Sequence, residues 1–118
     1  FSAFTNKYRT PNLKLLHEIC IDEIVIIKTT ESLPEKYNLE TFITPRKELL
    51  TSGTLTDFEE YEIEEQTTII RNIAQRISHY RKEGILNNVS FSNKGIKIFQ
   101  IVKTNNNWVI CSVIWSDE

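Results

Sequence analysis

KGIKIFQIV at residues 94–102 and WVICSVIW at residues 108–115 are the two runs that decide the fold. Both are rich in β-branched and aromatic residues, which favour strands. The run Asn105-Asn106-Asn107 lies between them, and asparagine is a typical turn residue. The C-terminal quarter is therefore predicted to form two long antiparallel strands joined by a turn.

Both faces of these two strands carry apolar side chains. Ile96 and Ile98 lie on one face of the first strand, and Phe99 and Ile101 lie on the other. An antiparallel sheet that helices cover on one side only should have one polar face. A second layer must therefore cover the other face, and the chain has no spare helix for it. We expect a homodimer that forms through the sheet.

The rest of the chain is interpreted from hydrophobic spacing and from turn residues. The predicted elements are a helix from Phe1 to Tyr8 that ends before Pro11, a short helix at 13–18, a strand at 19–28, a loop at 29–38, a helix at 39–50, strands at 54–67 and 69–82, and a turn region at 83–92. Pro45 lies inside the third helix and could begin a new helical turn. Helices followed by consecutive antiparallel strands indicate an α+β domain with its helices on one face of a curved sheet.

Composition indicates an ordinary folded domain. A chain of 118 residues, 40% hydrophobic and 25% charged, is expected to form one domain over 1–118. The net charge of -2 gives no bias towards nucleic acid or membrane, and no apolar run approaches the ~20 residues that span a bilayer. Because the chain has no Met, we expect it to be trimmed before Phe1. Separately, we expect a cytoplasmic protein. Cys20 and Cys111 lie in apolar runs and are expected to be buried, reduced thiols.

Four segments of the chain resemble, in order, those of a known group. Residues 58–63 resemble an F-x-E-x-E-I run, and residues 72–80 resemble an N-I-A-x-x-x-S-x-Y strand. Residues 95–101 resemble G-I-x-x-x-Q-L, and residues 108–118 resemble W-x-I-x-x-x-x-W-x-x-E. On these segments the region from Ile19 to Glu118 is similar to small bacterial proteins of the SnoaL-like, or nuclear transport factor 2-like, superfamily. The resemblance implies a cone-shaped α+β fold (cystatin-like), in which a curved antiparallel sheet wraps around N-terminal helices and leaves a pocket at the wide end.

The superfamily includes ketosteroid isomerase-like and polyketide cyclase-like enzymes, dehydratases and non-enzymatic binding or association domains. The group resembled here has no settled activity, and fold does not determine function. This chain departs from the group's pattern at Arg71, where a Gly usually precedes N-I-A, and at Lys94, where Arg is common. Lys97 and Ile98 replace smaller polar residues.

Acidic residues recur along one predicted strand. Glu60, Glu62 and Glu64 alternate with other residues and are predicted to share a face. A carboxylate in an apolar pocket can act as a general base once its pKa is raised. The alternative is a solvated acidic face. Glu60 and Glu62 are the better catalytic candidates, because the pattern resembled here retains them.

Polar and aromatic residues on the later strands are candidates for binding a ligand. Asn72, Ser78 and Tyr80 are predicted to share a face with Ala74, and a tyrosine hydroxyl there could polarise a carbonyl oxygen. The alternative is a core tyrosine that hydrogen-bonds a neighbour. Gln100 is expected either to cap a buried polar network or to point into the pocket. Trp115 is expected to line the pocket.

No metal-ligand spacing occurs in the sequence. The two histidines, His17 and His79, are far apart and are interpreted as surface residues; Asp22 is interpreted as an ordinary strand-end aspartate. The basic residues at 71, 76, 81, 82, 94 and 97 lie beside the acidic strand, which would cancel their field. We expect no metal, no cofactor, no nucleic acid and no membrane partner.

These observations support three functional hypotheses. The first is a small-molecule-binding domain, for an apolar or carbonyl-containing ligand, lined by Asn72, Ser78, Tyr80, Gln100 and Trp115. The second is a cofactor-independent isomerase, cyclase or dehydratase. Its base would be Glu60 or Glu62, and Tyr80 would stabilise an enolate. The third is a non-catalytic dimerisation module whose pocket is filled by its own side chains.

Overall fold

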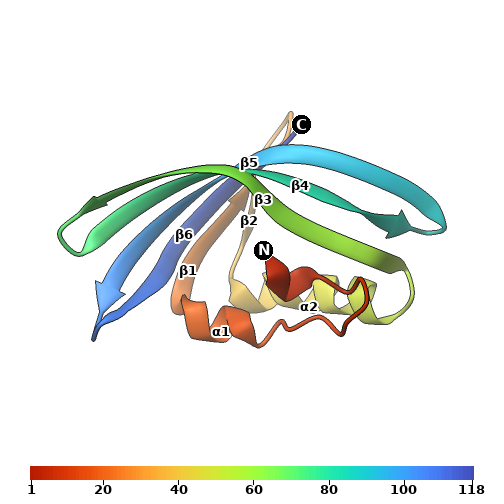
Figure 1. The fold of residues 1–118 in the computed structure, drawn as a ribbon, viewed down its shortest axis with the longest axis horizontal. Helices are drawn as coiled ribbons and strands as arrows, with labels where there is room; N and C mark the ends of the chain where they lie inside the picture. The colour runs from red at the N-terminus through yellow and green to blue at the C-terminus, as the bar shows by residue number, and fades with distance from the viewer.

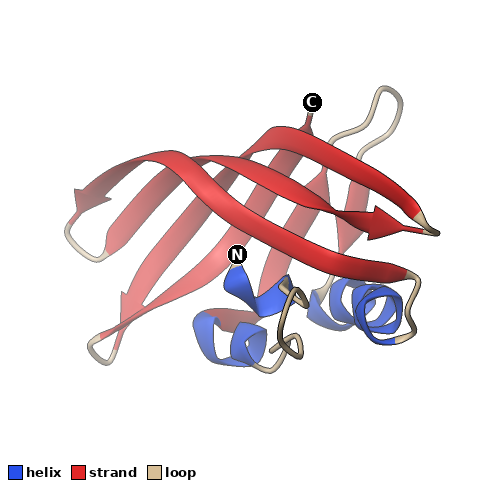
Figure 2. Cartoon of the chain, turned by 45° about the vertical axis from the view of Figure 1, so that its right-hand side comes forward, coloured by secondary structure: helices blue, strands red, loops and turns tan.

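In the computed structural model, which describes residues 1–118, six strands form one curved sheet that arches over the helices (Figures 1 and 2). The elements are η1 (Ser2–Phe4), α1 (Leu15–Ile19), β1 (Cys20–Lys28), β2 (Glu35–Tyr37), α2 (Leu39–Thr51), β3 (Leu55–Ile70), β4 (Ile73–Leu86), β5 (Val89–Thr104) and β6 (Asn107–Asp117). The strand order is β2-β1-β6-β5-β4-β3. Strands β1 and β6 run parallel, and all other neighbours are antiparallel. The α+β class with a curved, mostly antiparallel sheet is confirmed.

Two-residue turns join the four long strands. Asn105 and Asn106 have φ of 45° and 69°, and Asn87 and Asn88 have φ of 50° and 67°. Both pairs adopt the left-handed backbone that two-residue hairpins favour and that asparagine tolerates. The predicted asparagine turn near residue 105 is confirmed. The turn predicted over 83–92 occurs at Asn87 and Asn88, but the predicted region is too long, because two asparagines suffice to reverse the chain and the residues on either side continue the strands.

The first predicted helix is mostly absent. Only Ser2–Phe4 forms a 3-10 turn, and Tyr8 is 95% exposed with φ of 61°. The Asn6 amide donates hydrogen bonds to the carbonyl oxygens of Leu50 and Leu55, at 3.0 and 2.7 Å, and its oxygen accepts from the Phe58 amide at 2.7 Å. These bonds hold the segment to α2 and β3 and replace the hydrogen bonds of a continued helix.

Helix α2 matches the prediction closely. Asn38 caps it, with its side chain accepting from the Thr41 amide at 2.8 Å, and Pro45 lies within it. The preceding loop prediction is wrong in part, because Glu35–Tyr37 forms strand β2 on the edge of β1. No helix in the structure has the length and apolar character that crossing a bilayer would require.

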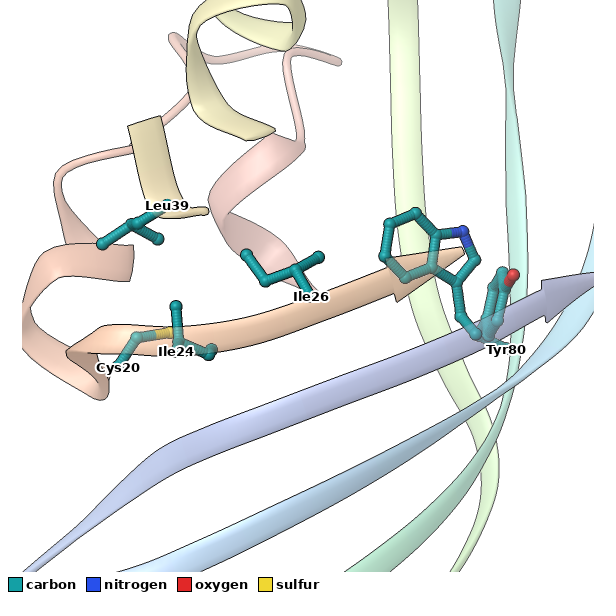
Figure 3. Close-up of a cluster of buried hydrophobic side chains, with 6 residues drawn as sticks. Cys20, Ile24, Ile26, Leu39 and Tyr80 are labelled. Atoms are coloured by element: carbon teal, nitrogen blue, oxygen red, sulfur yellow. The ribbon is translucent and has the colours of Figure 1, made fainter. Parts of the chain in front are cut away.

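The hydrophobic core lies between the inner face of the sheet and the helices. It consists of Cys20, Ile24, Ile26, Leu39, Tyr80 and Trp115 (Figure 3). Both cysteines are free: Cys20 is buried, as expected, whereas Cys111 is only half-buried. Burial raises the pKa of the Cys20 thiol to about 11.

The two faces of the sheet differ in composition. A row across the inner face contains Lys28, Trp115, Lys97 and Ser78, on β1, β6, β5 and β4. The neighbouring row on the outer face contains Ile27, Ile114, Ile98 and Ile77 on the same strands. We call this second set the isoleucine row; Ile98 is 37% and Ile114 41% exposed. The inner face meets the helices, whereas no part of the chain covers the isoleucine row.

Strand β3 contains two irregularities in its pairing with β4, one between Thr56 and Glu59 and one between Glu62 and Glu64. A bulge adds one residue and reverses the face on which later side chains lie. Glu60 and Glu62 therefore share the inner face with Phe58, as predicted. Glu64, which pairs with His79, lies on the outer face, so its predicted place beside them is wrong.

Candidate functional site

A cavity of about 460 Å³ lies between the inner face of the sheet and α2. Ten of its 17 lining residues are hydrophobic. The lining consists of Phe4, Lys28, Phe42, Pro45, Arg46, Leu49, Leu50, Leu55, Phe58, Glu60, Tyr80, Lys82, Leu86, Phe91, Asn93, Lys97 and Trp115. The cavity thus combines a mainly apolar wall with a small set of charged groups from β1, α2, β3, β4 and β5.

Aromatic rings form the wall near α2. Phe42 meets Trp115 edge-on, with ring centroids 5.5 Å apart, and Tyr37 stacks on Trp115 at 6.4 Å. The Arg46 guanidinium lies over Phe42, 3.8 Å from the ring centroid, because the two residues are one helical turn apart. Such edge-on and cation–π contacts hold flat rings in place. This wall is suited to a flat, apolar ligand.

One ion pair lies within the cavity. The Lys97 ammonium donates a hydrogen bond to the Glu60 carboxylate, and their side chains are only 14% and 9% exposed. Lys97 also lies over the Tyr80 ring, 4.8 Å from its centroid. A buried charge needs a partner, so each of these two groups depends on the other.

A second polar group surrounds Asp117. Its carboxylate accepts hydrogen bonds from the Tyr80 hydroxyl and, at 2.8 Å, from the Lys82 ammonium, and Lys28 approaches it to 3.8 Å. Burial acts to raise the pKa of Asp117, but the bonds from Lys82 and Tyr80 outweigh it and hold that pKa below its usual range. Burial, together with the bond to Asp117, raises the pKa of Tyr80. Tyr80 is therefore a neutral hydrogen-bond donor.

Gly95 makes room for Tyr80. It pairs with Tyr80 across β4 and β5, and the Tyr80 hydroxyl occupies the space that a Cβ on Gly95 would fill. That Cβ would also lie 2.5 Å from the Ser116 carbonyl oxygen, closer than real Cβ atoms approach. The glycine in the segment 95–101 is thus required by packing.

Glu62 and Ser78 form a separate group outside the cavity lining. Arg76 binds both oxygens of the Glu62 carboxylate, and the Ser78 hydroxyl donates to the same carboxylate. The Arg76 hydrogen bonds, and secondarily the Ser78 hydroxyl, hold the pKa of Glu62 below its usual range despite some opposition from burial. Ser78 is fully buried. Neither residue lines the cavity.

The expectation that Asn72 and Gln100 line the cone is corrected by the structure. Asn72 is exposed in the β3–β4 turn, at the far end of the hairpin. Gln100 is exposed on the outer face, where its side-chain oxygen accepts a hydrogen bond from the Ser112 hydroxyl at 2.8 Å. Gln100 is three residues from Lys97, and an odd spacing along a strand reverses the face. Its amide therefore neither caps a buried network nor points into the cavity.

The remaining candidates lie on the surface. His17, His79 and Asp22 are exposed, as interpreted from the sequence. No group of three His, Cys, Asp or Glu residues is placed to hold a metal ion. Of the predicted site residues, the structure brings together Glu60, Tyr80 and Trp115 in one cavity.

Among the residues that sequence reasoning missed are Arg46, which lines the cavity, and Asp117, which binds the lining residues Tyr80 and Lys82. Arg46 follows Phe42 by four residues, so the two share a face of α2. This spacing could have indicated that Arg46 lies beside the apolar face of the helix. Asp117 follows Trp115 by two residues, which places both on the inner face of β6.

The sequence matches no protein-family model and no curated protein. Solved structures are similar to it. A Kribbella flavida protein has a TM-score of 0.71 and 18% identity, over 88% of this chain and 75% of that one. A nuclear transport factor 2-like protein of Cytophaga hutchinsonii has a TM-score of 0.70 and 13% identity, over 91% and 83%. A candidate ketosteroid isomerase of Shewanella frigidimarina has a TM-score of 0.65 and 16% identity, over 87% and 80%.

At these identities the likeness shows the fold alone. The chain has the nuclear transport factor 2-like fold, which the four sequence segments implied. Because one fold hosts many functions, the function must be argued from the cavity of this chain.

Proposed function

We propose that this chain is a small-molecule-binding domain of the SnoaL-like kind, whose ligand occupies the cavity inside the cone. The observation that carries the proposal is the cavity itself, with its volume of about 460 Å³ and its mainly hydrophobic lining. Ligand pockets commonly have volumes of about 300–1,000 Å³, apolar walls and a few placed polar groups. Tyr80 and Trp115 would contact the ligand.

The enzyme alternative is less well supported by the same side chains. A general base needs a raised pKa, whereas hydrogen bonds lower the pKa of Glu62. Glu60 lines the cavity, but its carboxylate is ion-paired with Lys97. A pure dimerisation module would have a cone filled by its own side chains, and here a cavity remains. Binding without a reaction is the function that we favour.

A neutral fluorescent probe, N-phenyl-1-naphthylamine, tests this proposal. The intact chain should bind the probe saturably, with an increase in emission. Leu49→Trp, which adds bulk to the cavity lining, should abolish binding, and Leu33→Trp, at a loop position that is 81% exposed, should not. Binding that does not saturate, or that Leu49→Trp leaves unchanged, would contradict a ligand site in the cone.

We also propose that two copies of the chain associate through the isoleucine row on the outer face. This row crosses four strands without a charged residue. A contiguous exposed apolar surface of this kind is typical of an interface. A straight row near the middle of a sheet can meet its own copy about a two-fold axis, as closed dimers require.

A further inference from the structure

The charged residues in the cavity are mostly cations. Lys28, Arg46, Lys82 and Lys97 line it, and Glu60 is the only carboxylate among the lining residues. Glu60 is paired with Lys97, and Asp117 binds Lys82 and approaches Lys28. Four cations against these two carboxylates leave an excess of positive charge around an otherwise apolar space. Such a site attracts an anion.

Arg46 is the one of these four cations that has no carboxylate within salt-bridge distance. It forms no salt bridge, and the hydrogen bond from its Nη1 goes to the Phe42 carbonyl oxygen of its own helix, at 3.0 Å. Its guanidinium lies over Phe42 and approaches the rings of Tyr37 and Trp115, with centroids at 5.2 and 5.8 Å. A guanidinium has five N–H donors, so donors remain for a further partner.

Unused N–H donors are unusual on a guanidinium that is partly buried, as that of Arg46 is. Burial lowers the pKa of Arg46, and smaller effects of Tyr37, Glu60 and Glu35 oppose this lowering. A partly desolvated guanidinium binds a planar carboxylate strongly, because two parallel N–H groups can meet both of its oxygens. The ring contacts fix the orientation of the guanidinium before any ligand arrives, which reduces the entropic cost of binding.

We propose that the cavity binds a small aromatic or otherwise flat apolar molecule bearing one carboxylate, and that Arg46 binds this carboxylate. The inference rests on the proposed binding function and specifies its ligand class. The apolar part of the ligand would lie in the cavity beside Phe42 and Trp115, and its carboxylate would meet the free N–H groups of Arg46. Lys97 stays with Glu60, and Lys82 stays with Asp117.

Displacement of bound N-phenyl-1-naphthylamine by a matched pair of ligands tests this inference. The pair is 2-naphthoate and its methyl ester, which share the ring system and differ in charge. In the unaltered chain, 2-naphthoate should displace the probe at a concentration at least about tenfold lower than the ester, as a charge-assisted hydrogen bond to Arg would give. This comparison needs no variant and so does not depend on whether any variant folds.

Arg46→Met then assigns the preference to one side chain. The variant keeps an apolar stem on the aromatic wall, and it should bind the ester as before while losing the preference for 2-naphthoate. Lys47→Met removes one positive charge from the adjacent, exposed position of α2 and should leave the preference unchanged.

Equal affinity for acid and ester in the unaltered chain, or a preference that survives Arg46→Met, would overturn the inference. In either case saturable binding of the neutral probe would leave the binding function standing. Failure of the probe and of both naphthalene ligands to bind would overturn both.

Discussion

The inner and outer faces of the same four strands differ in which side chains are buried and which are exposed. On the inner face, charged groups are partly buried, and no buried side-chain nitrogen or oxygen lacks a hydrogen-bond partner. On the outer face, the isoleucine row stays partly exposed with nothing from the chain above it. The helices of the same chain cover the inner face except at the cavity, whereas no part of the chain covers the isoleucine row on the outer face. The proposed ligand site therefore lies on the inner face, and the proposed contact between two copies lies on the outer face.

The largest expected effect comes from closing space on the inner face. Gly95→Ala should lower the free energy of unfolding by about 3 kcal/mol, because the added methyl group overlaps the Tyr80 hydroxyl and the Ser116 carbonyl oxygen. Urea denaturation measures this loss. Gly84→Ala is the matched control: its Cβ would come no closer than 3.2 Å to Phe58 and Thr56, so its cost should be smaller. Equal costs would show that Tyr80 does not depend on Gly95.

The next effect comes from leaving one inner charge without its partner. Lys97→Met should destabilise the chain by about 2 kcal/mol, since Glu60 would remain in the cavity without its hydrogen-bond partner. Adding Glu60→Gln should recover most of this loss. Chemical denaturation of both single variants and the double variant gives the coupling between them. Additive effects would mean that the pair is screened by water.

Acidification should lower the stability of the chain by protonating Glu62 and Asp117 on the inner face. The pKa values of Glu62 and Asp117 are lowered in the folded chain, so the stability that they contribute is present at neutral pH and is lost as pH falls through their folded values. Glu62→Gln should reduce the loss of stability below about pH 4, where unfolded carboxyl groups titrate. Thermal unfolding between pH 2 and 7 measures the slope. A slope that Glu62→Gln leaves unchanged would contradict the assigned role of Arg76.

The smallest effect on the fold is expected on the outer face, where association should change instead. Ile98→Glu should convert a dimer to a monomer with native circular dichroism, because charge in the isoleucine row prevents an apolar contact. Val89→Glu, at a position beside the β4–β5 turn that is 67% exposed, should leave the dimer intact. Sedimentation equilibrium distinguishes the states. An unaltered chain that is monomeric, or an Ile98→Glu variant that remains dimeric, would contradict association through this row.

The sequence predicted the order of elements better than the faces on which their residues lie. The long strands and α2 were recognisable because their patterns are long and regular, whereas the short strand β2 was missed and the break predicted at residue 68 lies inside β3. The two bulges in β3 were not recognisable, since no residue between Thr56 and Glu64 signals an insertion. Strict alternation therefore placed Glu64 on the wrong face. The extent of β4 and β5 was missed because Asn87-Asn88 was not recognised as a complete turn.

The site was predictable only in part, for a related reason. Glu60, Tyr80 and Trp115 were identified because each lies within a long run of β-type residues that the structure confirms as a strand. Gln100 was misplaced because the predicted faces had no reference to the helices that define the inside. Asn72 was misplaced because the strand predicted at 69–82 runs through the β3–β4 turn. Arg46 was missed because a charged residue on a helix is ordinarily exposed, and only the positions of the Phe42 and Trp115 rings show that it is not.

The two tryptophans provide the most direct test of the central claim that ligand binds on the inner face. Trp115 lines the cavity, whereas Trp108 lies beside the β5–β6 turn and is 39% exposed. Their two indole N–H signals in a ¹H–¹⁵N spectrum can be followed while 2-naphthoate is added. The account predicts a saturable shift of the Trp115 signal with no change in the Trp108 signal. A Trp115 signal that does not move, or two signals that move together, would contradict it.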